Sequence, residues 1–325
     1  MKVCVFGAGA IGGHLAARFA AGGAEVSVVA RGAQLDAIRA KGLRVHGHGT
    51  DLQVQVAASD DPATLGRQDA VVVTVKAPAL PQVAQTIAPL LERDTPVAFV
   101  MNGIPWWYFA RLGTEAEGTR LPALDPDDAL WRAVGPDRAV GGVIWSACTV
   151  TEPGVVELGG ARNRVAFGEP DGSLSPRVQA LAEAAQAGGM TGETTERIRD
   201  LVWSKLLLNL GSGPACVLTG TGAAALMREP ALERLVGAVC EEVVAIGTAW
   251  GCTVQNNLDA HLALLRRTEH TPSIVQDLQR GRPMEVEAMF AIPLELARMK
   301  QVQTPVLDLL VGLAKVRARA AGLYP

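Results

Sequence analysis

The chain has 325 residues, of which 49 % are hydrophobic and 19 % are charged. This length suits two domains, and the composition is typical of ordered globular proteins rather than disordered ones. Lys and Arg together number 30 against 33 Asp and Glu, so the formal net charge is -3. Such a balance offers no field of one sign to hold a nucleic acid or an acidic membrane surface, and neither is an expected partner.

Cysteine usage and hydrophobicity indicate a cytoplasmic protein. The five cysteines are scattered without short paired spacings, and an odd number cannot close into a full disulfide set. No stretch approaches the roughly 18 unbroken apolar residues that span a bilayer. The apolar opening segment is interrupted by glycines, so we interpret it as part of the fold rather than as a secretion signal.

The first half of the chain alternates short β-branched runs with Ala- and Leu-rich stretches. This pattern builds a parallel sheet covered by helices. The predicted strands and helices, in chain order, are strands 2–6, 25–30, 70–75 and 96–101, with helices at 12–21 and 80–91. Residues 111–138 are weakly periodic and predict a loop with a short helix, and the strand-like runs 140–160 and 163–169 predict hairpins or an added antiparallel edge.

Beyond about residue 195 the sequence becomes rich in long apolar helical stretches separated by Gly or Pro. The predicted fold is therefore α/β, with a Rossmann-type dinucleotide-binding domain at 1–195 and a mostly helical domain at 196–325. Because the last predicted helices are apolar, a homodimer is one of the states that the sequence allows.

A glycine-rich turn follows the first predicted strand and opens the first helix. In this context, backbone N–H groups approach a pyrophosphate at a helix N-terminus, whereas the alternative is an ordinary strand-to-helix turn. The residues of this turn are Gly7, Ala8, Gly9, Ala10, Ile11 and Gly12.

The end of the second strand predicts the cofactor. An enzyme selecting NAD places an acid there for the ribose 2′-hydroxyl, but this chain has Arg31, whose guanidinium suits the 2′-phosphate of NADPH. Lys76 follows the third strand and could reinforce the same phosphate. The alternative for both residues is an ordinary surface cation at a strand end.

Asn102 and Gly103 end the fourth strand on the same edge of the sheet. Asn-Gly pairs readily form turns, which is the structural alternative. The Asn102 side chain carries a donor and an acceptor, so it could also hold the nicotinamide carboxamide or a substrate oxygen.

In the helical half, Lys205 and Asn209 lie four residues apart on one face of an apolar helix. Partial desolvation would lower the pKa of the Lys205 amine and make it a candidate proton donor to a carbonyl oxygen. The residues alone favour the alternative, a lysine whose head reaches solvent. Ser273 and Glu285 do not indicate a function by themselves, because most such residues are helix caps or surface charges. The pair His46 and His48 has no third candidate ligand nearby, so no metal site is expected.

Together these segments resemble the ketopantoate reductase family, the 2-dehydropantoate 2-reductases, along nearly the whole chain. The matching segments are GAGAIG, VVAR, VTVKA, the MNG turn, WSKLLLN, and SIVQD with Glu285 twelve residues after Ser273.

The resemblance implies an NADPH-binding first domain, a helical second domain, and a small 2-oxo acid held in the cleft between them. Lys205 falls on the family's catalytic lysine and Glu285 on its essential acid. The resemblance further implies hydride delivery to the C2 carbonyl, with Lys205 as general acid. Asn102, Asn209 and Ser273 match positions that hold cofactor or substrate by hydrogen bonds.

Two departures from the family pattern concern the substrate pocket. Gly213 stands where the family usually has a second Asn, and Phe290-Ala291 replaces an Asn-Gly that often follows the essential Glu. Ketopantoate is the expected substrate. The alternatives are a paralogous reductase of another small 2-oxo acid or carbonyl and a non-catalytic nucleotide-binding sensor.

Overall fold

The computed structural model describes residues 1–255, 257–268 and 271–325 and divides the chain into two compact units. Unit 1 comprises Met1–Met101 and Pro105–Ile198, and unit 2 comprises Asn102–Ile104 and Arg199–Pro325. The main division lies close to the predicted boundary between residues 195 and 196. The short segment Asn102–Ile104 belongs to unit 2 although its sequence neighbours belong to unit 1.

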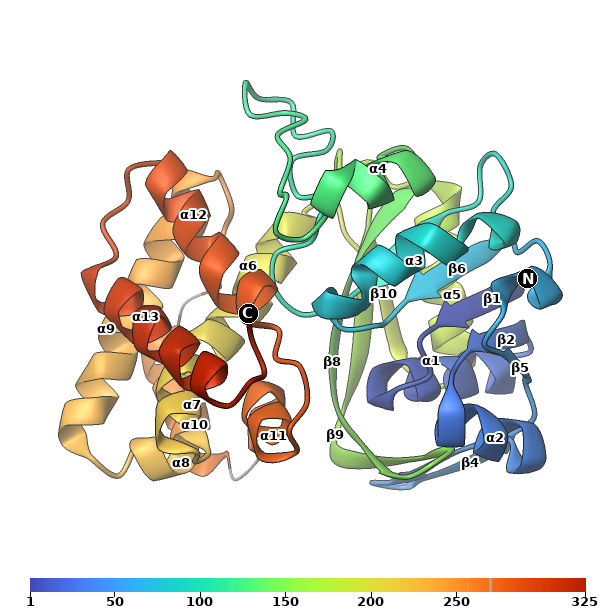
Figure 1. Ribbon diagram of the computed structural model, residues 1–325, viewed down its shortest axis with the longest axis horizontal. Helices are drawn as coiled ribbons and strands as arrows, with labels where there is room; N and C mark the ends of the chain where they lie inside the picture. Colours follow the sequence, from blue (N-terminus) through green and yellow to red (C-terminus); the bar gives the residue numbers. More distant parts are fainter. Residues whose placement is uncertain (256, 269–270) are drawn as a thin grey trace. The chain divides into compact units, whose positions relative to one another are not determined.

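Parallel strands in the order β5-β2-β1-β6-β7-β8 run from one edge of the unit 1 sheet to its middle (Figure 1). Strands β6 and β7 are buried at every residue, as expected for a parallel sheet covered on both faces. Because β1 is central, the carboxyl ends of β1 and β6 flank the switch point at which such sheets bind ligands. The bounds are β1 Lys2–Phe6, β2 Glu25–Val29, β5 Ala57–Ser59, β6 Ala70–Val73, β7 Val97–Val100 and β8 Ala139–Glu152.

The sheet continues beyond β8 through an antiparallel extension. Strand β9 (Val155–Gly168) pairs antiparallel with β8 and carries β10 (Thr191–Thr194) along its C-terminal half. Strand β3 (Leu43–Gly47) pairs with the beginning of β9 and forms a hairpin with β4 (Thr50–Val54). Of the two predicted alternatives, the hairpin is present: β8 and β9 are two long antiparallel strands that lie inside the sheet rather than at its edge.

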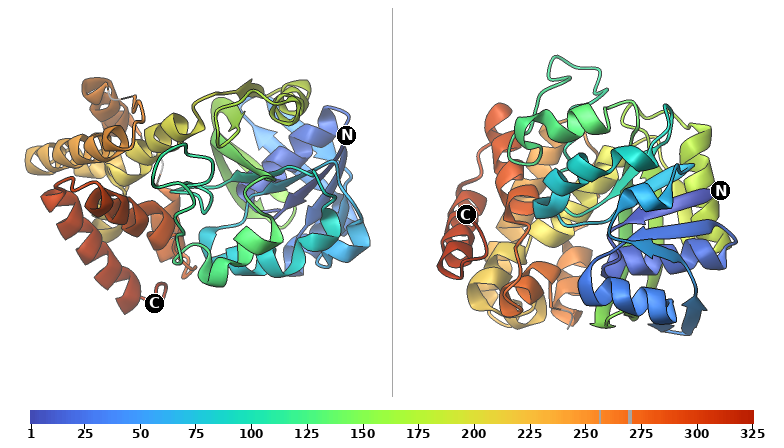
Figure 2. Two further views of the ribbon diagram at one scale, coloured as in Figure 1. Left: turned by 90° about the horizontal axis from the view of Figure 1, so that it is seen from above. Right: turned by 45° about the vertical axis from the view of Figure 1, so that its right-hand side comes forward.

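Two layers of helices cover the unit 1 sheet (Figure 2). One layer contains α1 packed against α5, and the other contains α3 packed against α4. The core beneath α1 includes Leu15, Phe19 and Phe167, each fully buried. The helices of unit 1 are α1 Ala10–Ala21, α2 Gly32–Lys41, α3 Leu80–Thr86, α4 Ala129–Ala133 and α5 Pro176–Ala187, with 3-10 turns at Pro62–Leu65, Ala77–Ala79, Ala88–Leu90 and Pro126–Asp128.

The sequence-based helix at 80–91 is too long. Helix α3 ends at Thr86, and a separate 3-10 turn spans Ala88–Leu90. Pro89 explains the break, because proline has no N–H to bond the carbonyl oxygen of Gln85 and its ring clashes with that carbonyl. All five cysteines are free thiols, and burial raises the pKa of the Cys4 thiol to about 12.

Among the described residues of unit 2, the regular elements are all helical, as the prediction of a mostly helical second domain requires. Helix α13 packs against α7 and α9, and α11 packs against α7. The bounds are α6 Ile198–Leu210, α7 Gly213–Thr219, α8 Ala223–Leu226, α9 Pro230–Ala249, α10 Leu258–Arg267, α11 Ser273–Gln279, a π-helical turn Glu287–Ala291, α12 Ile292–Met299 and α13 Pro305–Ala320.

One helical stretch of the described chain, Ile198–Thr219, is long and apolar enough to cross a membrane by length and composition. In the most apolar part of this stretch, 67 % is buried inside the structure. Such burial is the pattern of a core helix, and Trp203 in this stretch is fully buried.

Candidate cofactor and catalytic site

The glycine-rich turn joins β1 to α1 at the carboxyl edge of the sheet. The Gly7 N–H donates to the Val29 carbonyl oxygen at 3.0 Å, and the Thr74 hydroxyl donates to the Gly7 carbonyl oxygen at 2.6 Å. Gly7 has φ +107°, a conformation that favours glycine. A Cβ atom on Gly12 would lie 1.8 Å from the Gly7 carbonyl oxygen. The turn therefore needs glycine at both positions.

The N-terminus of α1 fits an anionic ligand. Gly9 is the N-cap of this helix, no side chain caps it, and its first turn contains no acid. A Cβ atom on Gly9 would meet nothing within 4 Å, so there is open space above the turn. Uncapped N–H groups facing open space at a helix N-terminus are the arrangement that holds a dinucleotide pyrophosphate.

The start of α2 lies beside this turn. The Gln34 side-chain amide donates to the Ala8 carbonyl oxygen at 2.7 Å and accepts from the Gly154 N–H at 3.0 Å. Arg31 is the N-cap of α2. Its side chain is exposed and makes no ion pair in the described part of the chain. The Arg31 guanidinium is therefore available to a phosphate, and Gln34 is a positioning residue that no sequence pattern indicated.

Lys76 follows β6 on the same edge of the sheet. It is the N-cap of the 3-10 turn Ala77–Ala79, and its side chain is partly buried. The structure places Lys76 at the carboxyl end of a strand adjacent to β1, as the sequence predicts.

In unit 2, α6 carries Lys205 and Asn209 one helical turn apart. Both side chains are partly buried. The Asn209 amide nitrogen is itself buried and has no hydrogen-bond partner in the described structure. An unpaired buried donor costs free energy, so a ligand acceptor at this position would be stabilising.

Glu285 lies just before the π-helical turn Glu287–Ala291 and is only 6 % exposed. The Ile104 N–H donates to the Ala288 carbonyl oxygen at 2.9 Å. Gly103 has φ +82°, and a Cβ atom there would lie 2.4 Å from the Ala288 backbone. The Asn102-Gly103 turn is therefore held against the π-helical turn that follows Glu285, which brings two predicted site segments together.

Helix α7 meets the same π-helical turn. Gly213 is the first residue of α7, four residues beyond Asn209, and it contacts the ring of Phe290. The α6–α7 connection and the turn after Glu285 therefore pack together and form one wall of the candidate substrate site. Ser273 is the first residue of α11 and is exposed; no described hydrogen bond joins it to the other predicted residues.

Comparisons with known proteins cover the whole chain. Residues 3–172 match the family described as ketopantoate reductase PanE/ApbA, and residues 197–318 match the C-terminal region of the same family. A 2-dehydropantoate 2-reductase of Mesorhizobium japonicum is 40 % identical over 326 residues, covering 100 % of both chains. One from Halobacterium salinarum is 28 % identical and covers 98 % of this chain and 99 % of its own.

Solved structures agree. A candidate ketopantoate reductase from Ralstonia solanacearum has a TM-score of 0.91 at 38 % identity, with 99 % of each chain covered. A 2-dehydropantoate 2-reductase from Geobacter metallireducens has a TM-score of 0.85 at 26 % identity, covering 97 % of this chain and 99 % of its own.

Proposed function

This chain belongs to the ketopantoate reductase PanE/ApbA family, and on that premise we propose that it reduces 2-dehydropantoate to pantoate, with Lys205 as general acid. The chain is an NADP-dependent oxidoreductase. The observation that supports the proposed site best is the buried, unpaired amide nitrogen of Asn209, one helical turn from Lys205. A bound 2-oxo acid offers carboxylate and carbonyl oxygens, which are the acceptors this donor lacks.

NADPH supplies the hydride when bound. The open N-terminus of α1 fits its pyrophosphate, with Gly7, Gly9 and Gly12 allowing the close approach of the backbone. In our proposal, Arg31 pairs with the 2′-phosphate and Lys76 reinforces that charge. Asn102 orients the carboxamide of the nicotinamide or a substrate oxygen.

The residues of unit 2 perform the acid chemistry. Lys205 donates a proton to the carbonyl oxygen of the substrate as negative charge develops there, and its positive charge stabilises the forming alkoxide. Glu285 interacts with this lysine or with the substrate hydroxyl. Asn209 and Ser273 bind the substrate through hydrogen bonds, so that the carbonyl is oriented toward the lysine.

A panel of substrates tests the proposal. Steady-state rates would be measured for 2-dehydropantoate, 2-oxoisovalerate, 2-oxobutyrate and pyruvate, each with NADPH and with NADH. We expect the highest kcat/KM with 2-dehydropantoate and NADPH. Negligible turnover of 2-dehydropantoate at saturating NADPH would contradict the substrate assignment.

A second candidate is the reduction of another small 2-oxo acid. It is favoured by the packing of Phe290 on Gly213, which makes this part of the wall apolar and compact rather than amide-lined. The same panel separates the two functions. A reductase of another 2-oxo acid would turn over that acid with NADPH and would show almost no activity with 2-dehydropantoate.

A further inference from the structure

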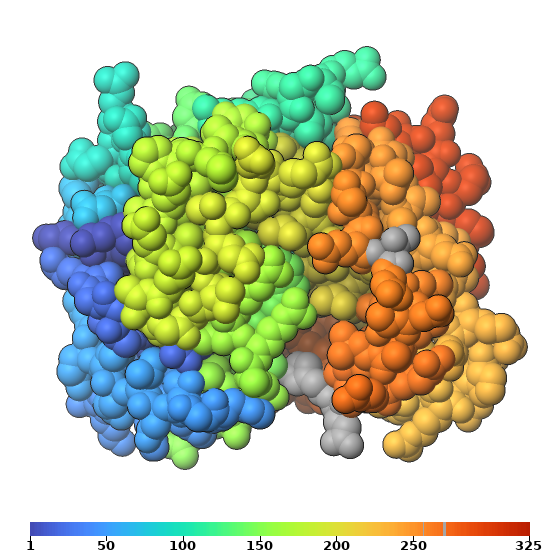
Figure 3. Space-filling view, turned by 180° about the vertical axis from the view of Figure 1, so that it is seen from behind, coloured from blue at the N-terminus to red at the C-terminus, as the bar shows by residue number. Residues whose placement is uncertain are grey.

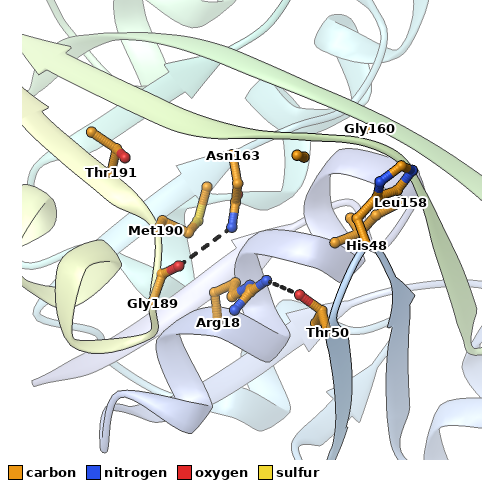
Figure 4. A pocket seen from close by; sticks show the side chains of 10 residues that line it. Arg18, His48, Thr50, Leu158, Gly160, Asn163, Gly189, Met190 and Thr191 are labelled. Carbon is orange, nitrogen blue, oxygen red and sulfur yellow. Dashed lines mark hydrogen bonds between the residues drawn. The ribbon is translucent and has the colours of Figure 1, made fainter.

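Unit 1 contains a pocket of about 380 Å³ at the C-terminal end of α1 (Figure 4). Its walls come from the end of α1, the β3–β4 turn, the middle of β9 and the turn between α5 and β10. Figure 3 shows the yellow-green surface of α5 and its following turn adjoining the blue surface of the N-terminal segments. The volume is within the range of sites that bind small molecules.

Arg18 lines this pocket as a buried cation, and none of the described residues forms an ion pair with it. The residue is 8 % exposed. Its guanidinium donates to the Gly188 carbonyl oxygen at 3.1 Å and to the Thr50 hydroxyl at 2.8 Å, while its Nε is buried and unpaired in the described structure. Both acceptors are neutral, so they satisfy hydrogen bonds but supply no negative charge. Removing a guanidinium from water without a compensating anion is costly.

Asn163 presents a second donor to the pocket. Its side-chain oxygen accepts from His14 Nε2 at 2.8 Å and from the Ser146 hydroxyl at 3.3 Å. Because that oxygen is occupied on both sides, the amide nitrogen is directed to the other side, where its contact with the Gly189 carbonyl oxygen is long, at 3.5 Å (Figure 4). Burial lowers the pKa of His14 to about 4, so the ring is neutral near pH 7 and adds no charge behind the amide.

The other residues that line the pocket also favour a negatively charged ligand. The described residues that line the pocket contain no Asp or Glu. His48, with φ +47° at the tip of the β3–β4 hairpin, and Thr191 at the start of β10 lie at the exposed rim. A cavity with a buried cation, an oriented amide donor and no carboxylate is complementary to an anion.

We propose that this pocket binds a small anion whose carboxylate or phosphate group pairs with Arg18 and accepts from the Asn163 amide. The site is separate from the glycine-rich turn. Arg18 lies eight residues after Ala10, the first residue of α1, which at 1.5 Å per residue is about 12 Å along the helix. The inference goes beyond the proposed reductase function and does not depend on it.

Titrations with malonate and with inorganic phosphate test the site and distinguish the two anion types. Each would be followed by amide ¹H–¹⁵N spectra of the full chain at constant ionic strength, in the presence of saturating NADP⁺ so that the glycine-rich turn is filled. We expect saturable shifts for residues 48–50 and 188–191 with one or both anions. Shifts confined to other residues, or no saturable shift with either anion, would overturn the proposal.

Two variants separate binding from folding. Arg18→Gln removes the charge but also the bonds to Thr50 and Gly188, so Thr191→Asp is the cleaner test because it adds a negative charge at the exposed rim. Thr151→Asp is its control, since Thr151 is also an exposed strand threonine but does not line the pocket. We expect Thr191→Asp to weaken anion binding at least tenfold and Thr151→Asp by less than twofold. Equal affinity in the two Asp variants would contradict the site.

Discussion

The ring of Phe290 packs directly on the backbone of Gly213. A Cβ atom on Gly213 would lie 3.3 Å from both Cε1 and Cζ of that ring, and Phe290 is fully buried. Gly213 begins α7, while Phe290 lies in the π-helical turn after Glu285. The small residue and the large one therefore fit against each other. They join the start of α7, which follows the helix that carries Lys205, to the turn that follows Glu285.

Replacing Gly213 with Ala should destabilise the fold despite the better helix propensity of Ala. Overpacking against a buried ring costs about 1–3 kcal/mol, whereas the Gly-to-Ala gain within a helix is at most about 1 kcal/mol. Urea denaturation measures the change. Gly237→Ala is the control, because Gly237 lies in α9 with nothing within 4 Å of its Cβ position, and it should be neutral or stabilising.

A double-mutant cycle tests whether the cost comes from the Phe290 ring. Phe290→Leu removes ring atoms and by itself should be destabilising. In that background, Gly213→Ala should cost clearly less, giving a coupling energy of about 0.5–3 kcal/mol. Strictly additive effects would show that the strain in Gly213→Ala arises elsewhere.

Arg31→Ala should weaken NADPH binding much more than NADH binding. The guanidinium contacts the 2′-phosphate in our proposal, and NADH lacks that group, so we expect at least about a tenfold loss for NADPH alone. Nicotinamide fluorescence titration measures both dissociation constants. Arg39→Ala removes the same charge from the last turn of the same helix and should change the ratio little. Equal losses for NADPH and NADH in Arg31→Ala would argue against the phosphate contact.

Lys205→Ala should lower kcat by about 10²–10⁴, the usual contribution of a general acid, while the NADPH dissociation constant stays within twofold. Lys205→Arg separates proton donation from charge alone. Arginine keeps the positive charge but does not release a proton in the accessible pH range, so a general acid predicts a severe loss here too. Substantial activity in Lys205→Arg would reduce the role of Lys205 to electrostatic stabilisation.

The sequence predicted the central sheet because its signals are local and strong. After the exposed Lys2, strand β1 is a run of buried apolar residues, and so is β6, and both runs contain valines. The glycine pattern lies between a strand and a helix. The β3–β4 hairpin, α2 and β10 were not predicted. Strand β4 alternates only between half-buried and exposed residues, and α2 buries only Leu35 and Ile38, so neither has a clear apolar face.

Parts of the site could not be predicted because their contacts are distant in sequence. Gln34 bonds Gly154, 120 residues away, and His14 bonds Asn163, 149 residues away. No spacing rule connects such residues. The pair Asn102-Gly103 was placed correctly at a strand end, but the packing of this segment against Ala288 follows from tertiary structure alone.

Asn209→Leu should separate stability from activity. The buried Asn209 amide nitrogen has no partner in the described structure, so an apolar side chain of similar size removes an unsatisfied donor. The free energy of unfolding should be unchanged or raised by about 1 kcal/mol, as measured by urea denaturation. In steady-state assays, kcat/KM for the 2-oxo acid should fall because the substrate loses a hydrogen bond. A clear loss of stability would show instead that Asn209 has a structural role.

His14 should make stability depend on pH between about 4 and 6.5. Burial lowers the pKa of His14 from 6.5 to about 4 in the folded chain, so at intermediate pH the unfolded state binds more protons. The contribution is therefore complete above about pH 6.5 and is lost as the pH falls toward 4, by at most about 1.4 kcal/mol per pH unit. Urea denaturation from pH 7.5 to 5 measures this slope. His14→Gln can still donate to Asn163 and should flatten it; some slope should remain, because burial also lowers the pKa of His261. An identical slope in both proteins would show that the His14 ring does not titrate differently on folding.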